Sequence, residues 1–302
     1  MSKVLCLGDS CADIIIPYGE SLYRNDVSVT FSCGGSTANT AYSLGKLNVD
    51  VSFSGKAGRD YYGLAMKKQL DEAKVNTNNF FIDENLVSTQ IMVVIDKNKE
   101  RHPFLMPKEN PSYLQIYPDE LDKIDLSDTE YIITNGMMLF RNPAAETIAD
   151  YLTQCHQKGI KILLDINYRI ETIDQDKTYL DKVISISDYL LGSLEDDFLP
   201  LTNTDNIQDA VKVLLKEDNA IIVHNAEGSS YYTKDKQGFD SSCKIDVIDT
   251  LGAGDAFNAG FIYGLVHNMN IESCNRCGLK TAAYCVSHHG ARNISDEKIL
   301  MD

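Results

Sequence analysis

The second half of the chain alternates between short apolar segments and helical patterns, and this alternation limits the fold more than any other feature. From residue 130 onward, segments of strand length are separated by segments with helical periodicity. Strands separated by helices pair in parallel, with helices on both faces of the sheet and binding sites at the carboxyl ends of the strands. We therefore expect an α/β fold with a mostly parallel central sheet, in which the strands are 131–134, 161–166, 189–192, 220–224 and 231–233 and the helices are 143–158, 177–187 and 207–216.

A second group of strand-like segments, at 13–31, 88–95 and 101–106, has no helical pattern between its members. Parallel strands of an α/β sheet need crossover connections, so we expect these segments to form a small separate sheet. This sheet would be a β lid over the substrate site, and an apolar open face on it predicts a homodimer formed through the lid. The expected division is an α/β core of 1–12, 33–85 and 111–302 and a lid of 13–32 and 86–110.

Charge and composition exclude several classes of partner. The 302 residues include 28 basic and 44 acidic side chains, a net charge of −16, which opposes binding to nucleic acid or to an anionic membrane. No apolar segment has the length of a membrane span, and the first nine residues lack the layout of a signal peptide. We expect a soluble cytoplasmic protein. The eight cysteines lie mostly in apolar segments, which indicates reduced core thiols, among them Cys6, Cys155, Cys243 and Cys285.

A cluster near the C-terminus could suggest a zinc site, because Cys274 and Cys277 are followed by Cys285, His288 and His289. The intervening residues have a helical pattern, which places Cys274 and Cys285 roughly 16 Å apart along the helix axis. That separation is too large for one tetrahedral ion. The spacing instead predicts one buried face of a helix.

The segment 249–258 reads Asp-Thr-Leu-Gly-Ala-Gly-Asp-Ala-Phe-Asn, between a strand-like segment at 243–248 and a helical pattern at 256–267. Gly252 and Gly254 leave backbone N–H groups accessible at a helix N-terminus, where an anion such as phosphate binds. Asp255 then stands where the anion should lie. It could take a proton from a hydroxyl that attacks a phosphate, or it could cap the helix, and the spacing alone leaves both interpretations open.

Other glycine-rich nucleotide sites are excluded. The chain has no Gly-x-x-x-x-Gly-Lys-Ser/Thr segment, so it contains no P-loop. Phe257 stands where the dinucleotide fingerprint needs its third small residue, which argues against a nicotinamide-dependent oxidoreductase.

The segment beginning at Asp249 resembles, at every position, the C-terminal signature Asp-Thr-x-Gly-Ala-Gly-Asp-x-Phe-x-Ala-Gly of the ribokinase, or PfkB-type, carbohydrate kinase family. Gly34-Gly35, followed by Asn39 on an expected helix at 36–47, resembles the family's N-terminal signature, although Ser36 and Thr37 stand where a small residue and Pro are usual. The resemblance extends over most of the chain. It implies a ribokinase-like fold.

The resemblance also implies a reaction, the ATP-dependent phosphorylation of a primary hydroxyl of a sugar or sugar acid, with Mg²⁺ bridging the phosphates. Asp255 would be the general base, and the amides of Gly252, Ala253 and Gly254 would stabilise the transferred phosphoryl group. The substrate-binding residues would be Asp13, Gly34, Gly35, Asn39, Lys108, Asn110, Arg169 and Asp255. From the residues alone, Asn39 could equally lie on the surface, and 108–110 could be a solvated loop.

The nucleotide would contact Asn167, Arg169, Ser193, Asn225, Gly228, Gly252 and Gly254, and 282–292 would form part of the adenine pocket. The Asp165-Ile-Asn-Tyr-Arg segment resembles the fructokinase and 2-keto-3-deoxygluconate kinase branches of the family, while ribose and nucleosides stay open as substrates. Asp249 and the Leu251 carbonyl match positions that hold a monovalent cation, potassium, in relatives.

Three further positions depart from the family pattern. Ser193 and Asp196 replace the Asn and Glu of an Asn-x-x-Glu segment that orients magnesium-bound water, with Asp196 as the magnesium-site residue. Asn225 replaces the first glycine of a Gly-x-x-Gly turn, and we expect it to keep that turn because Asn tolerates left-handed backbone. These departures motivate an alternative, a catalytically weakened sugar-binding or regulatory protein on a kinase fold.

Overall fold

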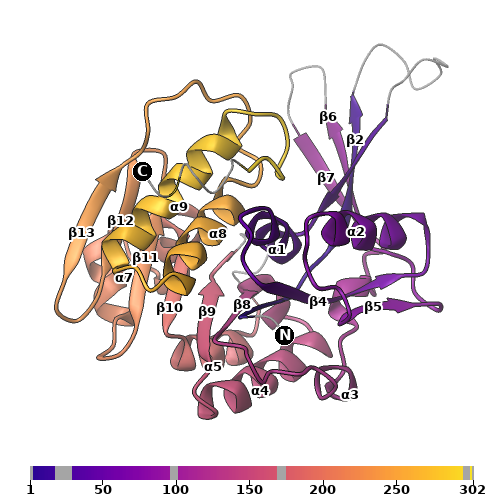
Figure 1. The fold of residues 1–302 in the computed structure, drawn as a ribbon, viewed down its shortest axis with the longest axis horizontal. Coiled ribbons are helices and arrows are strands. Elements are labelled where there is room, and N and C mark those ends of the chain that lie inside the picture. Colours follow the sequence, from indigo (N-terminus) through magenta and orange to yellow (C-terminus); the bar gives the residue numbers. More distant parts are fainter. Residues whose placement is uncertain (1–2, 18–28, 96–100, 169–174, 295–299, 301–302) are drawn as a thin grey trace.

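The computed structural model describes residues 3–17, 29–95, 101–168, 175–294 and 300, and a nine-stranded sheet forms its core (Figure 1). The strand order is β13-β12-β11-β10-β9-β8-β1-β4-β5, in which the strands from β11 to β5 pair in parallel. The mostly parallel sheet is therefore confirmed. Its strands are β1 (Val4–Leu7), β4 (Val51–Gly58), β5 (Phe80–Asp83), β8 (Tyr131–Asn135), β9 (Lys161–Asp165), β10 (Tyr189–Ser193), β11 (Ala220–His224), β12 (Gly228–Tyr232) and β13 (Gln237–Ser241).

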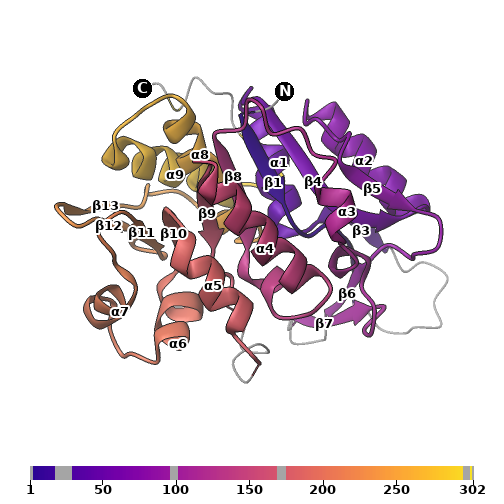
Figure 2. The same ribbon diagram turned by 90° about the horizontal axis from the view of Figure 1, so that it is seen from below.

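Helices cover both faces of this sheet (Figure 2). One face packs against α1 (Ser36–Lys46), α2 (Tyr61–Glu72), α8 (Ala253–Val266) and α9 (Ile271–Val286). The other face packs against α3 (Pro118–Leu121), α4 (Ala144–Gln157), α5 (Thr178–Ile186), α6 (Leu199–Thr202) and α7 (Ile207–Leu214). Strand β1 supplies both layers, because alternate side chains of a strand point to opposite faces. Val4 and Cys6 enter one apolar cluster, and Leu5 and Leu7 enter the other.

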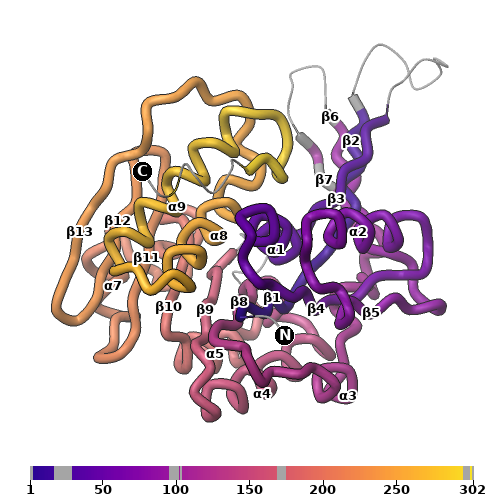
Figure 3. Tube along the Cα trace, in the orientation of Figure 1, coloured from indigo at the N-terminus to yellow at the C-terminus, as the bar shows by residue number. Residues whose placement is uncertain are grey.

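A second sheet of four strands stands beside the core, with the order β3-β2-β6-β7 (Figures 1 and 3). It confirms that the segments without crossover helices form a sheet of their own. The expected turn at 96–99 lies outside the described residues, as do residues 18–28. The strands are β2 (Cys11–Pro17), β3 (Thr30–Gly34), β6 (Gln90–Ile95) and β7 (Arg101–Met106).

Two strand predictions near the edge of the large sheet are wrong. The segment 231–233 was expected in a parallel strand, but β12 pairs antiparallel with β11. Only residues 225–227 join the two strands, and so short a connection makes a hairpin rather than a crossover. The segment 243–248 is not a strand. Polar Lys244 and Asp246 alternate with its apolar residues, and no described strand beyond β13 offers it a partner.

The cysteines are free thiols, and all of them except Cys243 are buried. The prediction that Cys243 lies in the core is wrong, since it belongs to the exposed segment that follows β13. Helix α9 buries Cys274, Cys277 and Cys285 along one face, which confirms the helical interpretation of their spacing. Among the described residues, no group of His, Cys, Asp and Glu side chains is arranged to hold a metal ion, and no helix is long and apolar enough to cross a membrane.

Candidate active site

The candidate site lies at the carboxyl edge of the large sheet, where the N-termini of α1 and α8 meet. Asp9 follows β1, Asp165 is the last residue of β9, and Ser193 and His224 end β10 and β11. The first turns of α1 and α8 are joined by hydrogen bonds between their side chains. Parallel strands bring their carboxyl ends to one edge, and this is where the alternation of strands and helices predicted a site.

Asp255 lies in the first turn of α8, and its carboxylate is held by α1. Ser36 Oγ donates to Oδ1 of Asp255 at 2.7 Å, and Asn39 Nδ2 donates to Oδ2 at 2.8 Å. Gly252 occupies the N-cap position of α8. Asp255 is therefore not the N-cap residue of its own helix, and the capping interpretation does not account for the contacts of its carboxylate with a second helix.

The turn that precedes α8 is shaped by its glycines. Gly252 has a left-handed φ of 78°, and a Cβ there would lie 2.6 Å from the backbone of Ala291. Gly254 is open by contrast, since a Cβ on it would meet only the ring of His224, at 3.7 Å. The Gly254 amide donates to no residue in the part of the chain that the structure describes. An N–H group at a helix N-terminus without a partner among the described residues can donate to a bound anion.

The glycine pair before α1 has a different use. Gly35 has a φ of 97°, and a Cβ on it would lie 2.7 Å from the carbonyl oxygen of Asp9. Asp9 then accepts hydrogen bonds from the amides of Ser36 at 2.9 Å and Thr37 at 3.0 Å. Asn135 Nδ2 adds a third donor to the same carboxylate, at 2.6 Å. The close approach at Gly35 is an approach of the chain to itself, and Asp9 fills the anion position of α1.

Asp13 is on strand β2 of the second sheet, beside Gly34, the other glycine of the pair. A Cβ on Gly34 would lie 2.2 Å from Oδ2 of Asp13, so the absence of a side chain at residue 34 makes room for this carboxylate. Burial raises the pKa of Asp13 to about 6, partly opposed by the Cys11 thiol and the Arg292 guanidinium. A carboxylate with a raised pKa beside a strand-end site is a candidate to bind substrate hydroxyls.

Asp165 is a site residue to which the sequence assigned no role, although it begins the Asp-x-Asn-x-Arg segment. Its Oδ2 lies 3.2 Å from Ser36 Oγ, the hydroxyl that also contacts Asp255. Since a hydroxyl has one proton to donate, it can satisfy only one of the two carboxylates at a time. The arrangement concentrates negative charge, which favours a cation in front of Asp165 and Asp255. The position of Asp165 at the end of an expected strand is the sequence feature that could have identified it as a site residue.

Ser193 and Asp196 lie where β10 passes into the π-helical turn η4 (Leu194–Phe198). Ser193 Oγ accepts from the amide of Asp196 at 3.3 Å and donates to Asp197 at 2.9 Å, so this hydroxyl is used within the protein. Asp196 presents an exposed carboxylate. Asp197, which the sequence did not single out, is buried and also accepts from the amide of Tyr168, which joins the loops after β9 and β10.

Asn167 lies in the loop after β9, with a left-handed φ of 40°, and is largely buried. Arg169 falls outside the described residues. Lys108 and Asn110 follow β7 and are exposed. Arg141 donates to the carbonyl of Lys108, and no described contact joins Lys108 or Asn110 to the residues around Asp255.

Asn225 shapes its turn through its side chain. Oδ1 of Asn225 accepts from the amides of Glu227 at 3.0 Å and Gly228 at 3.1 Å. The turn is kept, but the expected reason is wrong, because the backbone at Asn225 does not have a positive φ. An Asn side chain that accepts from the amide two residues later forms a turn without left-handed backbone.

Asp249 and Leu251 join the α8 turn to the turn that follows α9. Asp249 accepts from the amide of Leu251 at 3.0 Å and from the amide of Gly290 at 3.0 Å. The carbonyl of Leu251 accepts from the thiol of Cys285, at 3.6 Å. These bonds hold the loop in front of α8 against the C-terminal segment.

Arg292, the last residue of the segment 282–292, lies on the α1 side of the site. Its Nε donates to Oδ1 of Asn39 at 2.8 Å, and its other nitrogens donate to the Gln69 side chain and, at 3.4 Å, to the carbonyl of Gly34. The chain turns at Gly290, with a φ of 89°, and this turn carries residue 292 away from α9 toward α1.

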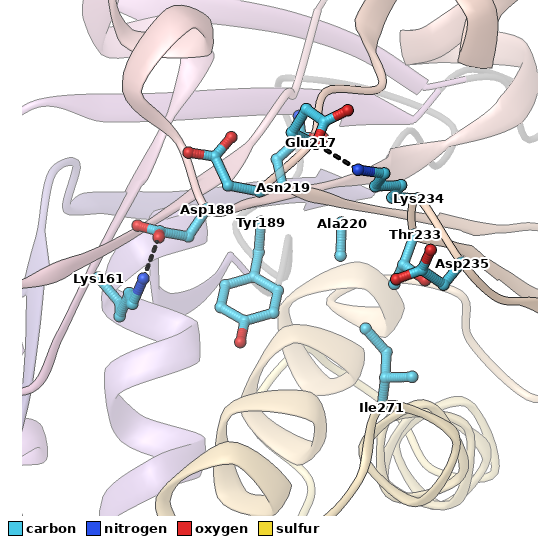
Figure 4. A pocket seen from close by; sticks show the side chains of 11 residues that line it. Lys161, Asp188, Tyr189, Glu217, Asn219, Ala220, Thr233, Lys234, Asp235 and Ile271 are labelled. Atoms are coloured by element: carbon cyan, nitrogen blue, oxygen red, sulfur yellow. Dashed lines mark hydrogen bonds and ion pairs between the residues drawn. The ribbon is translucent and has the colours of Figure 1, made fainter.

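A pocket at the opposite edge of the sheet is separate from this site (Figure 4). Tyr189 and Ala220, which line it, are the first residues of β10 and β11, so the pocket lies at the amino ends of the strands. Figure 4 shows the ion pair between Lys161 and Asp188, 2.7 Å apart, at its rim. Since binding sites of parallel sheets form at the carboxyl ends, the strand geometry favours the edge with Asp255.

Comparison with known proteins agrees with this geometry. The family model described as "pfkB family carbohydrate kinase" matches residues 1–298. The 5-dehydro-2-deoxygluconokinase of Halalkalibacterium halodurans is 26% identical over 95% of this chain and 89% of that protein. A protein described as a ribokinase II from E. coli, solved with ATP and Mg²⁺, superposes with a TM-score of 0.86 and 20% identity, covering 100% of this chain and 98% of that one.

A fructokinase double mutant from Vibrio cholerae, solved with fructose, ADP and potassium, superposes with a TM-score of 0.84 and 21% identity, covering 100% of this chain and 97% of that one. The structural matches show that the chain has a ribokinase-like fold. Because the family model spans nearly the whole chain, the protein belongs to the pfkB family of carbohydrate kinases.

Proposed function

We propose that this sugar kinase transfers the γ-phosphoryl group of ATP to the primary hydroxyl of a sugar acid, 5-dehydro-2-deoxygluconate or a close relative such as 2-keto-3-deoxygluconate. The observation that carries the proposal is the Asp255 carboxylate, held by Ser36 and Asn39 in front of the open N-terminus of α8. A relative named 5-dehydro-2-deoxygluconokinase, matched over 95% of the chain, supports this substrate class.

In this proposal Asp255 takes the proton of the attacking hydroxyl as the oxygen forms its bond to the γ-phosphorus and the bond to the ADP oxygen breaks. The amides of Gly252, Ala253 and Gly254 donate toward the phosphoryl oxygens, where negative charge is spread in the transition state. Asp13 and Asn39 hold substrate hydroxyls, and the backbone of Gly34 and Gly35 brings the sugar close to α1.

The carboxylates at the strand ends fit a divalent cation. Asp165 and Asp196 offer the oxygen ligands that Mg²⁺ prefers, and Asp165 lies in a region of concentrated negative charge. Bound Mg²⁺ would offset the charge of the phosphates. We further propose that Asp249 and the Leu251 carbonyl hold potassium.

The nucleotide base would lie along the segment that precedes the α8 turn. Val247 is 61% exposed and Ile248 is 52% exposed, although both are apolar. A base stacked on these side chains would remove them from water, and burial of apolar surface favours binding. In this arrangement Asn225 and Gly228 lie on the nucleotide side and Ser193 supports the loop that carries Asp196.

We also propose a homodimer through the lid. Phe104 is 53% exposed and Met106 is 44% exposed, both on β7. Phe104 pairs with Met92, which pairs with Ile14, so an apolar row crosses the sheet. A second lid would cover this row. Phe104→Lys should convert a dimer to a monomer by sedimentation velocity, and a wild-type protein that stays monomeric at high concentration contradicts the proposal.

The proposed reaction is tested by measuring ADP formation with 5-dehydro-2-deoxygluconate, 2-keto-3-deoxygluconate, fructose, ribose and a nucleoside. We expect kcat/KM for a sugar acid to exceed that for each neutral compound by about 10-fold or more, the scale of one well-placed polar contact. Faster turnover of a neutral sugar would overturn the substrate class. Binding of ATP and a sugar acid in a thermal-shift assay without turnover would favour the weakened binding protein.

A further inference from the structure

Arg292 is a partly buried arginine held from several directions. Besides Asn39, it contacts the Gln69 side chain on α2 and the carbonyl of Gly34, and its guanidinium lies 5.3 Å from the centre of the Tyr42 ring. These partners come from the segment before α1, from α1 and from α2. The orientation of the guanidinium is therefore fixed by several parts of the core at once.

The chain of hydrogen bonds that leads from Arg292 through Asn39 to Asp255 has only one consistent direction. A guanidinium donates and cannot accept, so the atom of Asn39 that faces Arg292 at 2.8 Å must be its carbonyl oxygen. The Asn39 amide nitrogen is then turned toward Asp255, to which it donates at 2.8 Å. A rotation of the amide by half a turn would place two acceptors, an amide oxygen and a carboxylate oxygen, against each other.

We propose that Arg292 is a positioning residue for the reaction, which sets the orientation of the Asn39 amide and through it the position of the Asp255 carboxylate. The inference rests on the proposed function, since it concerns the residue assigned as general base. Arg292 acts through Asn39 and needs no contact with the substrate. The carboxylate is thereby held at both oxygens, by Ser36 at Oδ1 and by Asn39 at Oδ2.

The orientation of the Asn39 amide matters because several carboxylates lie near Asp255. Asp165 shares the Ser36 hydroxyl with Asp255, Asp9 binds the α1 amides beside Ser36, and Asp13 faces Gly34. These carboxylates repel Asp255, so a neutral donor with a fixed direction is needed to hold it in place. His224, at the end of β11, packs beside the α8 turn, and burial lowers its pKa, which favours the neutral form.

The test is a double-mutant cycle on the full chain, with Arg292→Met, Asn39→Ala and the double variant. Arg292→Met should lower kcat about 10- to 100-fold, the scale of a small misplacement of reacting groups. The KM for ATP should change by less than about 3-fold, because the nucleotide lies on the α8 side. In the Asn39→Ala background, adding Arg292→Met should lower kcat by less than about 2-fold, since the Asn39 side chain through which Arg292 acts is already absent.

Two further variants separate positioning from structure. Arg292→Lys keeps a donor and should recover most of the lost kcat, because lysine also cannot accept a hydrogen bond. Gln69→Met is the matched control, since it removes another partner of Arg292 without touching Asn39. Its kcat should stay within about 3-fold of wild type, below the misplacement scale. Equal losses from Arg292→Met in both backgrounds, or a loss confined to the KM of the sugar acid, would overturn the proposal.

A measurement without turnover keeps this inference distinct from the reaction itself. In protein labelled with ¹⁵N-asparagine, the Asn39 side-chain NH₂ signal, assigned with Asn39→Ala, reports its bond to Asp255. Arg292→Met should speed exchange of these protons with water by about 10-fold or more, since an unheld amide opens more often. If the wild type phosphorylates no sugar acid, the proposed function fails, and this exchange rate alone decides the positioning role. Unchanged exchange would refute it.

Discussion

Helices α1 and α8 begin in the same way but present their N-termini to different partners. Each follows a glycine with left-handed backbone, Gly35 with a φ of 97° and Gly252 with a φ of 78°, and neither glycine can cap its helix with a side chain. At α1, the Asp9 carboxylate accepts from the first amides. At α8, no side chain of the N-cap residue takes that place, and a Cβ on Gly254 would meet only the ring of His224.

The difference separates two uses of one local structure. A helix N-terminus attracts negative charge wherever it lies, so the glycine pattern alone indicates an anion without saying which. At α1 the anion is part of the protein, and the result is stability. At α8 we propose that the anion is a phosphate, and the result is catalysis. Asp255 stands between the two, in the first turn of one helix and bonded to side chains of the other.

The largest effect is expected when the charge of Asp255, in the first turn of α8, is removed. Asp255→Asn should lower kcat by about 10²- to 10⁴-fold, because an amide cannot accept the hydroxyl proton. Folding should be little affected, since Gly252 is the N-cap residue. The measurement is kcat together with the melting temperature. Near-normal turnover would refute the assignment of Asp255 as general base.

At the N-terminus of α1, which Asp9 occupies, we expect a substitution to lower the stability of the protein. Asp9→Ala removes the acceptor of Ser36 N, Thr37 N and Asn135 Nδ2. Leaving such buried donors without a partner costs about 1–3 kcal/mol each at most, and partial access to water reduces the sum, so we expect a total of about 2–4 kcal/mol. Urea denaturation measures it. A loss below about 0.5 kcal/mol would mean that the α1 N-terminus is not closed by Asp9 in solution.

Asp13 provides a contrast with Asp9. It also lies near the N-terminus of α1, but no backbone amide among the described residues donates to its carboxylate. Burial raises its pKa to about 6, so the folded protein holds the proton more tightly than the unfolded chain does. Its contribution to stability is fully present below the unfolded pKa near 3.8 and is lost as the pH rises through about 6. Asp13→Asn removes the ionisable group, so this variant should not lose that stability as the pH rises.

The free energy of unfolding of Asp13→Asn, relative to wild type, should therefore rise by about 1–3 kcal/mol between pH 4 and pH 7. Urea denaturation of both proteins at several pH values measures the difference. A difference that does not vary with pH would show that Asp13 is ionised over this whole range in the folded protein.

The smallest effect is expected at Asn225, where another strand-end turn is closed by its own side chain. Asn225→Gly removes the acceptor of the Glu227 and Gly228 amides and should cost about 0.5–1 kcal/mol of stability, since Glu227 is exposed and its amide can donate to water instead. ATP affinity should stay equal or improve. Calorimetry measures it, and a large loss of affinity would show that Asn225 contacts the nucleotide directly.

The sequence by itself determined the features that depend on local pattern. Alternation of strands and helices predicted the parallel sheet and the edge at which Asp165 and Ser193 lie. The absence of crossover helices predicted the second sheet, and the glycines around residue 253 predicted the open N-terminus of α8. Periodicity and left-handed backbone act within a few residues, so a single sequence contains them.

The tertiary structure decided which side chain meets which group. Asp9 fills the N-terminus of α1, residues 243–248 lie outside the sheet, and Arg292 turns toward Asn39. Ser36 and Asp255 are 219 positions apart in the chain, and Asn39 and Arg292 are 253 apart. No local preference encodes such pairs, because the packing of α1 against α8, and of the C-terminal segment against both, brings the partners within hydrogen-bonding distance.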